Sequence, residues 1–321
     1  MMEDIRFAVH SGQLHGTVEA CVELWQRAEE LGYDSISIFD FLRPWAYPPD
    51  WPCFEGTTLL AALASRTSRI RCAMMVSPIT WRHPAVMANI ASTLDHISGG
   101  RLEFGVGAGG TDRAYEQYGI PFPSTAVRAG MLDEACRVLR SLWERDETTF
   151  HGEHYTFDRA CLAPKPVQAR LPLIVGANGL RHMIPLAARH ADVWNSVSAS
   201  PQEYRRKVEV FDDACERAGR DPGEVRKSIT FRAVVTPSGA GRRTSSELAD
   251  TPDAIRNQYI SFGSAEQCVE ALAPYVELGA TDFVLAVKAP VDWQTLELVA
   301  TQVAPAVRQL ARDRRPVLSG S

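Results

Sequence analysis

Short apolar runs of strand length alternate with longer segments of helical period along the whole chain, and this alternation restricts the fold more than any other feature. The runs occupy residues 5–10, 35–39, 70–76, 102–106, 173–175, 192–197, 229–235 and 282–287. In the first helical segment, residues 17–31, Ala20, Leu24, Ala28 and Leu31 form one apolar stripe that Gly32 follows. Because strands that alternate with amphipathic helices pair in parallel, an α/β fold is expected.

The number of βα units favours a closed (β/α)8 TIM barrel over two separate Rossmann-like halves. No Pro/Gly linker or change of composition marks a midpoint, so residues 1–321 are expected to form a single domain. Further helices are predicted over residues 57–67, 84–98, 128–143, 180–190, 201–218 and 293–310, with one more after the cap Ser264 and a hairpin around residues 151–154. Three insertions, near residues 41–54, 107–127 and 237–262, all follow strands, so we expect them to gather over the C-terminal mouth of the barrel.

Composition and charge favour a small-molecule partner. The net charge of −5 and the pI near 5.9 provide no basic field for nucleic acid or anionic lipid. The seven cysteines include no CxxC pair, so neither a disulfide framework nor a zinc site is predicted. The chain enters an apolar strand without a signal-peptide pattern and has no apolar run long enough for a membrane helix, so a cytoplasmic location is expected.

Two glycine clusters follow predicted strands. Gly107, Ala108, Gly109 and Gly110 resemble a dinucleotide-binding loop, but residues 120–123 (Ile-Pro-Phe-Pro) intervene before the next helix, which disfavours a Rossmann site and leaves a simple strand-exit turn as the alternative. The second cluster, Gly176, Ala177, Asn178 and Gly179, lies directly before a predicted helix. A helix N-terminus suits a cofactor phosphate, and a tight turn without a ligand is the alternative.

Polar residues at the strand ends are candidates for chemistry, because barrel enzymes place their reactive groups there: His10, Asp40, Ser77, Asn195, Ser196 and Lys288. The imidazole of His10 suits a general acid near neutral pH, although a structural histidine is an equal alternative. Asp40 is expected either to orient a ligand or to cap a loop, and Lys288 either to reach the mouth or to face solvent. His151 and His154 are three residues apart, but Gly152 interrupts a helix between them, so no metal site is predicted.

Taken together, several ordered segments resemble the bacterial luciferase-like superfamily, particularly its branch of coenzyme F420-dependent oxidoreductases. The resemblance covers residues 5–311 and is carried by residues 28–35 (AEELGYDS), 58–64 (TLLAALA), 69–71 (RIR), 82–85 (RHPA), 93–102 (TLDHISGGRL) and 187–192 (AARHAD). It implies a hydride-transferring enzyme that acts on a carbonyl, imine or activated alkene. An FMN-dependent monooxygenase and a non-catalytic flavin-binding barrel are the alternatives, and a homodimer is implied.

The resemblance also implies roles for particular residues. The cofactor ring is expected in the barrel mouth, next to a non-prolyl cis peptide around Met74, Met75 and Val76. Asp40, Gly107, Ala108, Gly109 and Thr111 are expected beside the ring, and residues 176–179 at the phosphate. Trp45 matches an active-site tryptophan of the sugar-phosphate dehydrogenases in its spacing from Asp40.

Two departures from the resemblance change the expected chemistry. Phe41 stands where many relatives have a histidine, and Gly110 where the sugar-phosphate dehydrogenases have a glutamate and others a tryptophan. Glucose 6-phosphate is therefore not the expected substrate, and His10, Glu55 or water is expected to handle the proton, with a structural role as the favoured alternative for Glu55. We expect a larger or aromatic substrate in an open apolar pocket lined by Phe41, Trp45, Trp51, Phe54, Trp81 and the space beside Gly110.

Overall fold

The eight strands predicted from the apolar runs close into a parallel barrel. The computed structural model describes residues 4–11, 13, 16–44, 48, 50–110, 113–197, 200–237 and 259–313. The barrel strands are β1 (Arg6–Ser11), β2 (Ser35–Ile38), β3 (Arg71–Pro78), β4 (Leu102–Gly107), β7 (Leu173–Gly176), β8 (Val193–Val197), β9 (Arg226–Val235) and β11 (Asp282–Val287). Each pairs with the next in this order, and β11 pairs back to β1, so the predicted (β/α)8 barrel is confirmed.

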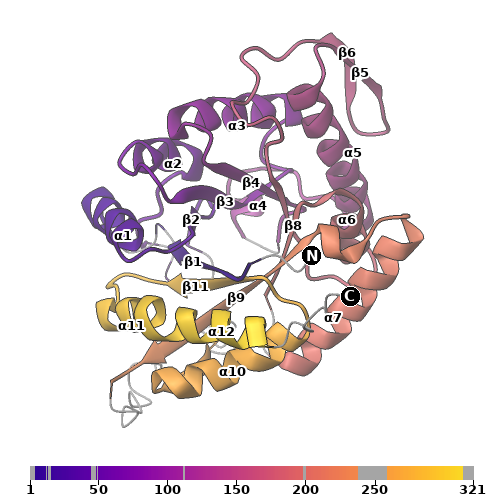
Figure 1. Ribbon diagram of the computed structural model, residues 1–321. Coiled ribbons are helices and arrows are strands. Elements are labelled where there is room, and N and C mark those ends of the chain that lie inside the picture. Colours follow the sequence, from indigo (N-terminus) through magenta and orange to yellow (C-terminus); the bar gives the residue numbers. More distant parts are fainter. Residues whose placement is uncertain are drawn as a thin grey trace.

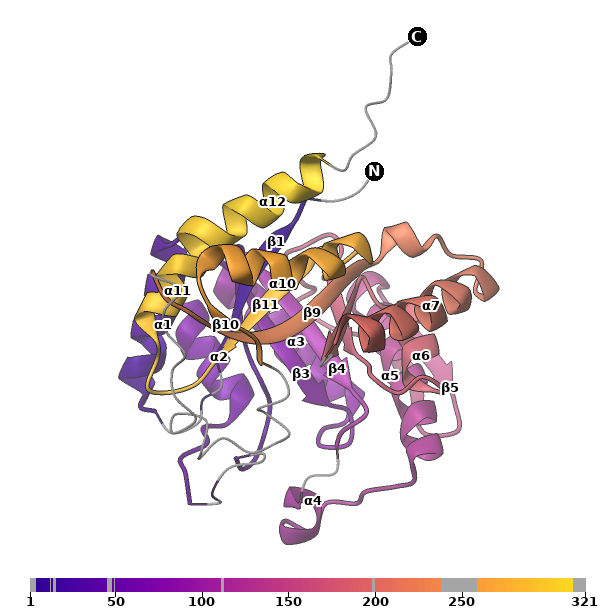
Figure 2. The ribbon, with the colours of Figure 1, turned by 90° about the horizontal axis from the view of Figure 1, so that it is seen from below.

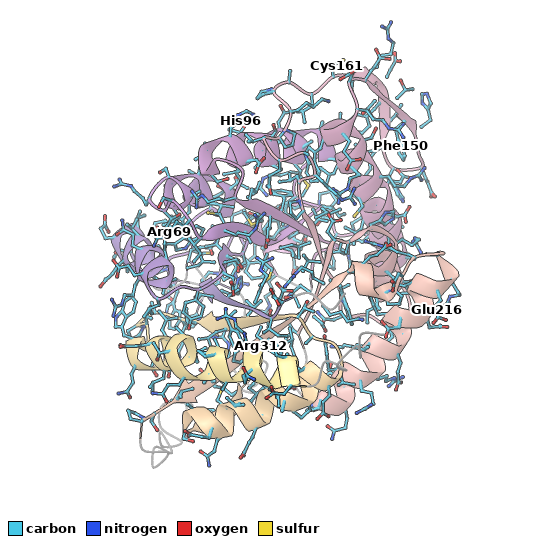
Figure 3. All side chains as sticks on the ribbon, viewed as in Figure 1. Arg69, His96, Phe150, Cys161, Glu216 and Arg312 are labelled. Atoms are coloured by element: carbon cyan, nitrogen blue, oxygen red, sulfur yellow. The ribbon has the colours of Figure 1, made fainter. Side chains whose placement is uncertain are left out.

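The helices surround the strands (Figure 1). They are α1 (Val18–Glu30), α2 (Gly56–Ala64), α3 (Pro84–Ser98), α5 (Thr125–Glu144), α6 (Met183–His190), α7 (Pro201–Arg217), α10 (Ala265–Glu277), α11 (Trp293–Leu298) and α12 (Ala304–Asp313), with a 3-10 turn over Pro222–Glu224 and a π-helical turn over Val299–Val303. Side chains fill the space between helices and strands, and Arg69, His96 and Cys161 lie at the periphery (Figure 3). No helix in the described part of the chain is long and apolar enough to span a bilayer.

Local signals in the sequence explain where several of these elements begin and end. Helix α3 starts at Pro84, whose fixed φ suits a first helical position, and it ends before Gly99, which adopts a left-handed φ of 66°. The predicted hairpin is also present, as β5 (Thr148–His151) and β6 (Thr156–Ala160). These boundaries depend on neighbouring residues alone, which is why the sequence predicts them well.

Three features differ from the prediction. The short helix α4 (Ala114–Gln117) interrupts the insertion after β4, and α6 begins at Met183 rather than residue 180. Within the predicted insertion 237–262, β10 (Tyr259–Gly263) pairs in parallel with β9. The sequence did not indicate β10 because its pairing depends on the second half of β9, which extends beyond the segment paired with β11.

Charged side chains close the end of the barrel where the strands begin. Glu103 on β4 accepts hydrogen bonds from Arg6 on β1 at 2.9 Å and from Arg71 on β3 at 2.7 Å. Asp282 on β11 accepts one from Arg226 on β9 at 2.8 Å. Because β1 and β4 are not neighbours in the ring, the Arg6–Glu103 contact crosses the barrel interior. Ligand access is thereby left to the opposite end, where α4 lies (Figure 2).

The N-terminus of α10 offers a local test of the fold. Ser264 accepts a hydrogen bond from the backbone of Gln267, whose side chain accepts one from the backbone of Ser264, which is the predicted cap in its reciprocal form. We expect Ser264→Ala to lower the free energy of unfolding by about 1 kcal/mol, measured by urea denaturation. Ser264→Asp retains a capping oxygen and serves as the control. Equal stability of the alanine variant and the wild type would contradict this role.

Candidate active site at the carboxyl ends of the barrel strands

A cavity of about 620 Å³ opens at the carboxyl ends of the strands. Residues on, or directly after, all eight barrel strands line it, so it lies on the barrel axis where enzymes of this fold bind ligands. Another hollow, of about 650 Å³, lies between α1 and α11 and is lined mainly by charged surface side chains. The first cavity contains three of the predicted strand-end residues, His10, Asn195 and Lys288, and we therefore take it as the candidate site.

The two glycine clusters meet at the floor of this cavity. The Met75–Val76 peptide bond is cis, which confirms the expectation for this stretch. Val76 packs against both clusters: a Cβ atom added at Gly107 would lie 2.8 Å from Val76 Cγ2, and one added at Gly176 would lie 3.1 Å from both Cγ atoms. Glycine at these positions therefore lets β4 and β7 approach Val76 closely. The result is a surface of small and apolar groups from three adjacent strands.

Most of the residues predicted to bind the cofactor lie along this cavity. Those that line it are Met75, Val76, Gly107, Ala108, Gly109, Gly176, Asn178 and Gly179. Met74 and Ala177 are buried in the hydrophobic core instead. Thr111 lies outside the described residues.

Asp40 and Glu55 do not reach the cavity. Asp40 is fully buried and accepts hydrogen bonds from Ser77 Oγ at 2.6 Å and from both terminal nitrogens of Arg82. Arg82 also pairs with Glu55, which caps α2 by accepting from the backbone of Thr58 at 2.6 Å. The position of Asp40 thus does not support its expected contact with a ligand, and Glu55 has the structural role that was its favoured alternative. The alternative interpretation of Asp40 as a group that holds a loop describes its contacts better.

The charges in this cluster are set by burial and hydrogen bonding. Burial raises the pKa of the Asp40 carboxyl, and the Arg82 guanidinium offsets only part of that rise. At Glu55, burial raises the pKa, but hydrogen bonds from Thr58 and Thr57 outweigh it and lower the pKa overall. Arg82 therefore joins two carboxylates from the segment between β2 and α2 and tethers them to the segment after β3.

The predicted aromatic pocket is present only in part. Phe41, Trp81 and Gly110 line the cavity. Trp51 packs on Phe39 beside it, and Phe54 packs on the main core. Trp45 lies outside the described residues. Apart from the chain neighbours of Gly110, no heavy atom of the described residues lies within 4 Å of a Cβ added there, at a position where some relatives are expected to carry a large side chain.

His10 lies in the cavity wall with one ring nitrogen already engaged. Its Nδ1 is hydrogen-bonded to Ser37 Oγ on β2 at 2.8 Å, and within the described part of the chain no protein group contacts Nε2. Burial, together with the positive charge of Arg232, lowers the pKa of His10 to about 3. The imidazole is therefore neutral near pH 7, and its low pKa disfavours protonation while the cavity is empty.

Asn195 presents a fixed amide to the same cavity. Its Nδ2 donates to Ser228 Oγ at 3.0 Å and to Thr230 Oγ1 at 3.1 Å, so both amide hydrogens are engaged. No described residue donates to Oδ1, which leaves an acceptor for a ligand. Of the other predicted strand-end residues, Lys288 lines the cavity, Ser77 holds Asp40, and Ser196 donates to Asn178 Oδ1 at 3.2 Å.

Several cavity residues were missed by sequence reasoning: Tyr115, Thr125, Arg128, Met183, Thr230 and Arg232. Arg232 is the charged residue of a mainly apolar predicted strand, and a charge at such a position is a signal that sequence reasoning can use. Tyr115 had no comparable signal, because it reaches the cavity through α4. A Cβ atom at Gly109, where φ is +80°, would lie 2.2 Å from the Tyr115 hydroxyl, so the glycine leaves room for this ring.

Comparison with known proteins identifies the family and agrees with the fold. The model of a family described as luciferase-like monooxygenase matches residues 4–242, more than half of the chain. The F420-dependent glucose-6-phosphate dehydrogenase of Intrasporangium calvum is 28% identical over 322 residues, covering 88% of this chain and 93% of that protein. An uncharacterized protein of Mycobacterium tuberculosis is 35% identical over 162 residues, covering 50% of this chain and 56% of that protein.

Two solved structures illustrate the shared fold. An F420-dependent secondary alcohol dehydrogenase in complex with an F420-acetone adduct has a TM-score of 0.83 and 23% identity, covering 95% of this chain and 99% of that chain. The long-chain alkane monooxygenase LadA has a TM-score of 0.81 and 16% identity, covering 100% of this chain and 94% of that chain. These likenesses concern the fold, and the family match is independent of them. The chain therefore belongs to the luciferase-like monooxygenase family.

Proposed function

We propose that this protein is an oxidoreductase that transfers a hydride between coenzyme F420 and a small organic substrate in the strand-end cavity. The observation that carries the proposal is the cavity floor, where Met75 and Val76 meet glycines from β4 and β7 and leave room for a flat heteroaromatic ring. The F420-dependent enzymes similar to this chain support the choice of cofactor. When bound, the deazaflavin supplies a carbon centre that donates or accepts a hydride.

The residues of the cavity suit an anionic cofactor with a ring at one end. Arg128 is buried and lines the cavity, and its Nε has no protein partner among the described residues. Its guanidinium lies over Phe122 at 3.8 Å from the ring centroid, and Nη1 donates to the carbonyl of Pro123 at 2.6 Å, which hold the side chain in place. We assign the phosphate to Arg128 and to the backbone of residues 176–179 before α6.

The second glycine segment is anchored before any ligand binds. Asn178 Oδ1 accepts from the backbone of Val197 at 2.9 Å and from Lys207 Nζ at 3.1 Å. These bonds fasten the turn to β8 and α7, so little conformational freedom is lost on binding. Asn195 Oδ1 is the acceptor that we assign to an N–H group on the ring edge.

We assign the proton transfer to His10. In the oxidising direction, the substrate hydroxyl gives its proton to Nε2, and the carbon that bears this hydroxyl gives a hydride to the cofactor, so that a carbonyl forms. Reduction reverses both transfers. The aromatic wall of Phe41 and Trp81 excludes water from this step. A carbonyl, imine or activated alkene is the proposed reducible group.

The homodimer and the single-domain organisation remain predictions.

The cofactor assignment is tested by titrating the purified protein with F420 and following its fluorescence. We expect saturable binding that Arg128→Gln weakens by at least about tenfold, because a charge-assisted contact to the phosphate is lost. Arg217→Gln, which removes an exposed arginine paired with Asp213, is the control and should leave binding unchanged. Tight binding of FMN with no response to F420 would instead favour a monooxygenase. A cofactor that binds but is never oxidised or reduced across a panel of substrates would favour a non-catalytic barrel.

A further inference from the structure

The basic side chains of the cavity stand on two opposite walls. Arg128, at the start of α5, follows β4, whereas Arg232 lies on β9 and Lys288 directly follows β11. In the ring of eight strands, β4 and β11 are four positions apart, which places them across the mouth from each other. None of the described residues that line the cavity is acidic. In the proposed function, Arg128 on one wall binds the cofactor phosphate. No ligand is assigned there to Arg232 and Lys288 on the other wall.

The second wall is a compact unit built on three adjacent strands. β11 lies between β1 and β9, and its Ala286 is the register partner of His10. Arg232 Nη1 reaches the carbonyl of the same Ala286 at 3.2 Å. His10 and Arg232 are therefore brought together over one residue of β11, and Lys288 follows two residues later. Thr230 and the fixed amide of Asn195 extend this polar wall along β9 and β8.

We propose that Arg232 and Lys288 form a subsite that binds a carboxylate group of the substrate beside His10. The proposal deepens the proposed function and rests on it, because assigning the subsite to the substrate requires the cofactor phosphate to occupy the opposite wall. A guanidinium matches a carboxylate in shape and donor geometry, and an ammonium adds charge without a fixed orientation. The apolar lining of Phe41 and Trp81 then receives the remainder of the substrate, so an aromatic or branched carboxylic acid is the preferred class.

The chemistry of His10 agrees with an anion at this position. Arg232 contributes to the low pKa of the imidazole, so a carboxylate bound to Arg232 offsets that positive field. The ring then accepts a proton more readily when substrate is present than when the cavity is empty. Among the described residues, the hydrogen-bond partner of the ring is Ser37 on β2, and it is uncharged. Substrate binding and proton acceptance are thereby coupled through Arg232.

The subsite is tested with benzoate and its uncharged analogue benzamide as probes, in calorimetric titrations of the F420-saturated protein. We expect benzoate to bind at least about tenfold more tightly than benzamide, and Arg232→Gln to abolish that difference. Arg232→Lys should retain part of the difference between benzoate and benzamide. If Arg232→Gln folds poorly, Lys288→Gln is the second variant and should reduce the same difference. Arg217→Gln, which removes an exposed arginine that does not line the cavity, is the matched control and should leave the preference for benzoate intact.

The outcomes separate the subsite from the proposed function. Equal affinities for benzoate and benzamide would overturn the subsite. A loss of F420 affinity in Arg232→Gln as large as that in Arg128→Gln would also overturn it, because the group would then belong to the cofactor. If the protein without cofactor binds benzoate through Arg232 but never binds F420, the carboxylate subsite stands and the proposed function fails.

Discussion

Replacing Arg82 with methionine is expected to lower the free energy of unfolding by about 3–5 kcal/mol, because the variant leaves the carboxylate of Asp40 buried without a counter-ion. Asp40 is fully buried, and Arg82 supplies two of its hydrogen bonds. Methionine keeps much of the volume of arginine, so the expected loss comes from charge rather than from a cavity. Urea denaturation near neutral pH measures the change.

Two further measurements connect this loss to Asp40. Adding Asp40→Asn to the Arg82→Met variant should recover part of the stability, because a neutral amide is less costly to bury than a carboxylate. The deficit of Arg82→Met should also shrink as the pH falls, since burial raises the pKa of Asp40 and its protonation removes the unpaired charge. A loss below about 1 kcal/mol would show that the carboxylate reaches solvent, as exposed ion pairs contribute no more than this.

A second large effect is expected in the pH dependence of stability through His10. Its pKa is lowered from 6.5 to about 3, so the folded protein binds fewer protons than the unfolded chain between these values. The neutral imidazole makes its full contribution to the free energy of unfolding above pH 6.5. As the pH falls toward about 3, the pKa of His10 in the folded protein, this contribution is lost at up to about 1.4 kcal/mol per pH unit. By about pH 4.5 the loss amounts to roughly 3 kcal/mol.

Comparison with a His10→Asn variant isolates this contribution. The free energy of unfolding is measured by denaturation at about pH 7 and at about pH 4.5. Its decrease between these two pH values should be roughly 3 kcal/mol smaller in His10→Asn than in the wild type. His96→Asn, on the outer face of α3, is the matched histidine control and should behave like the wild type (Figure 3). Identical pH profiles for His10→Asn and the wild type would contradict a buried neutral imidazole beside Arg232.

The sequence predicted the chemistry of the cavity floor better than that of its walls. The glycine clusters at 107 and 176 and the Met75–Val76 stretch depend on local backbone requirements, which a motif displays directly. Asp40 was assigned to a ligand because a polar residue after a strand is a common active-site feature, and Glu55 was considered for proton transfer because Phe41 replaces a histidine. Whether such a carboxylate faces a ligand depends on a partner that a motif does not contain, and here Arg82 binds both.

The sequence by itself determined the eight barrel strands, the capped helices and the position of the mouth, because hydrophobic periodicity and turn residues act over a few neighbouring positions. Only the tertiary structure decided that Asp40 is held by Arg82, that His10 lies beside Arg232, and that Arg128 and Arg232 occupy opposite walls. These pairings join residues far apart in the chain. They exist because strand pairing around the ring brings β2 beside β3 and places β11 between β1 and β9, and no local pattern encodes which side chains then meet.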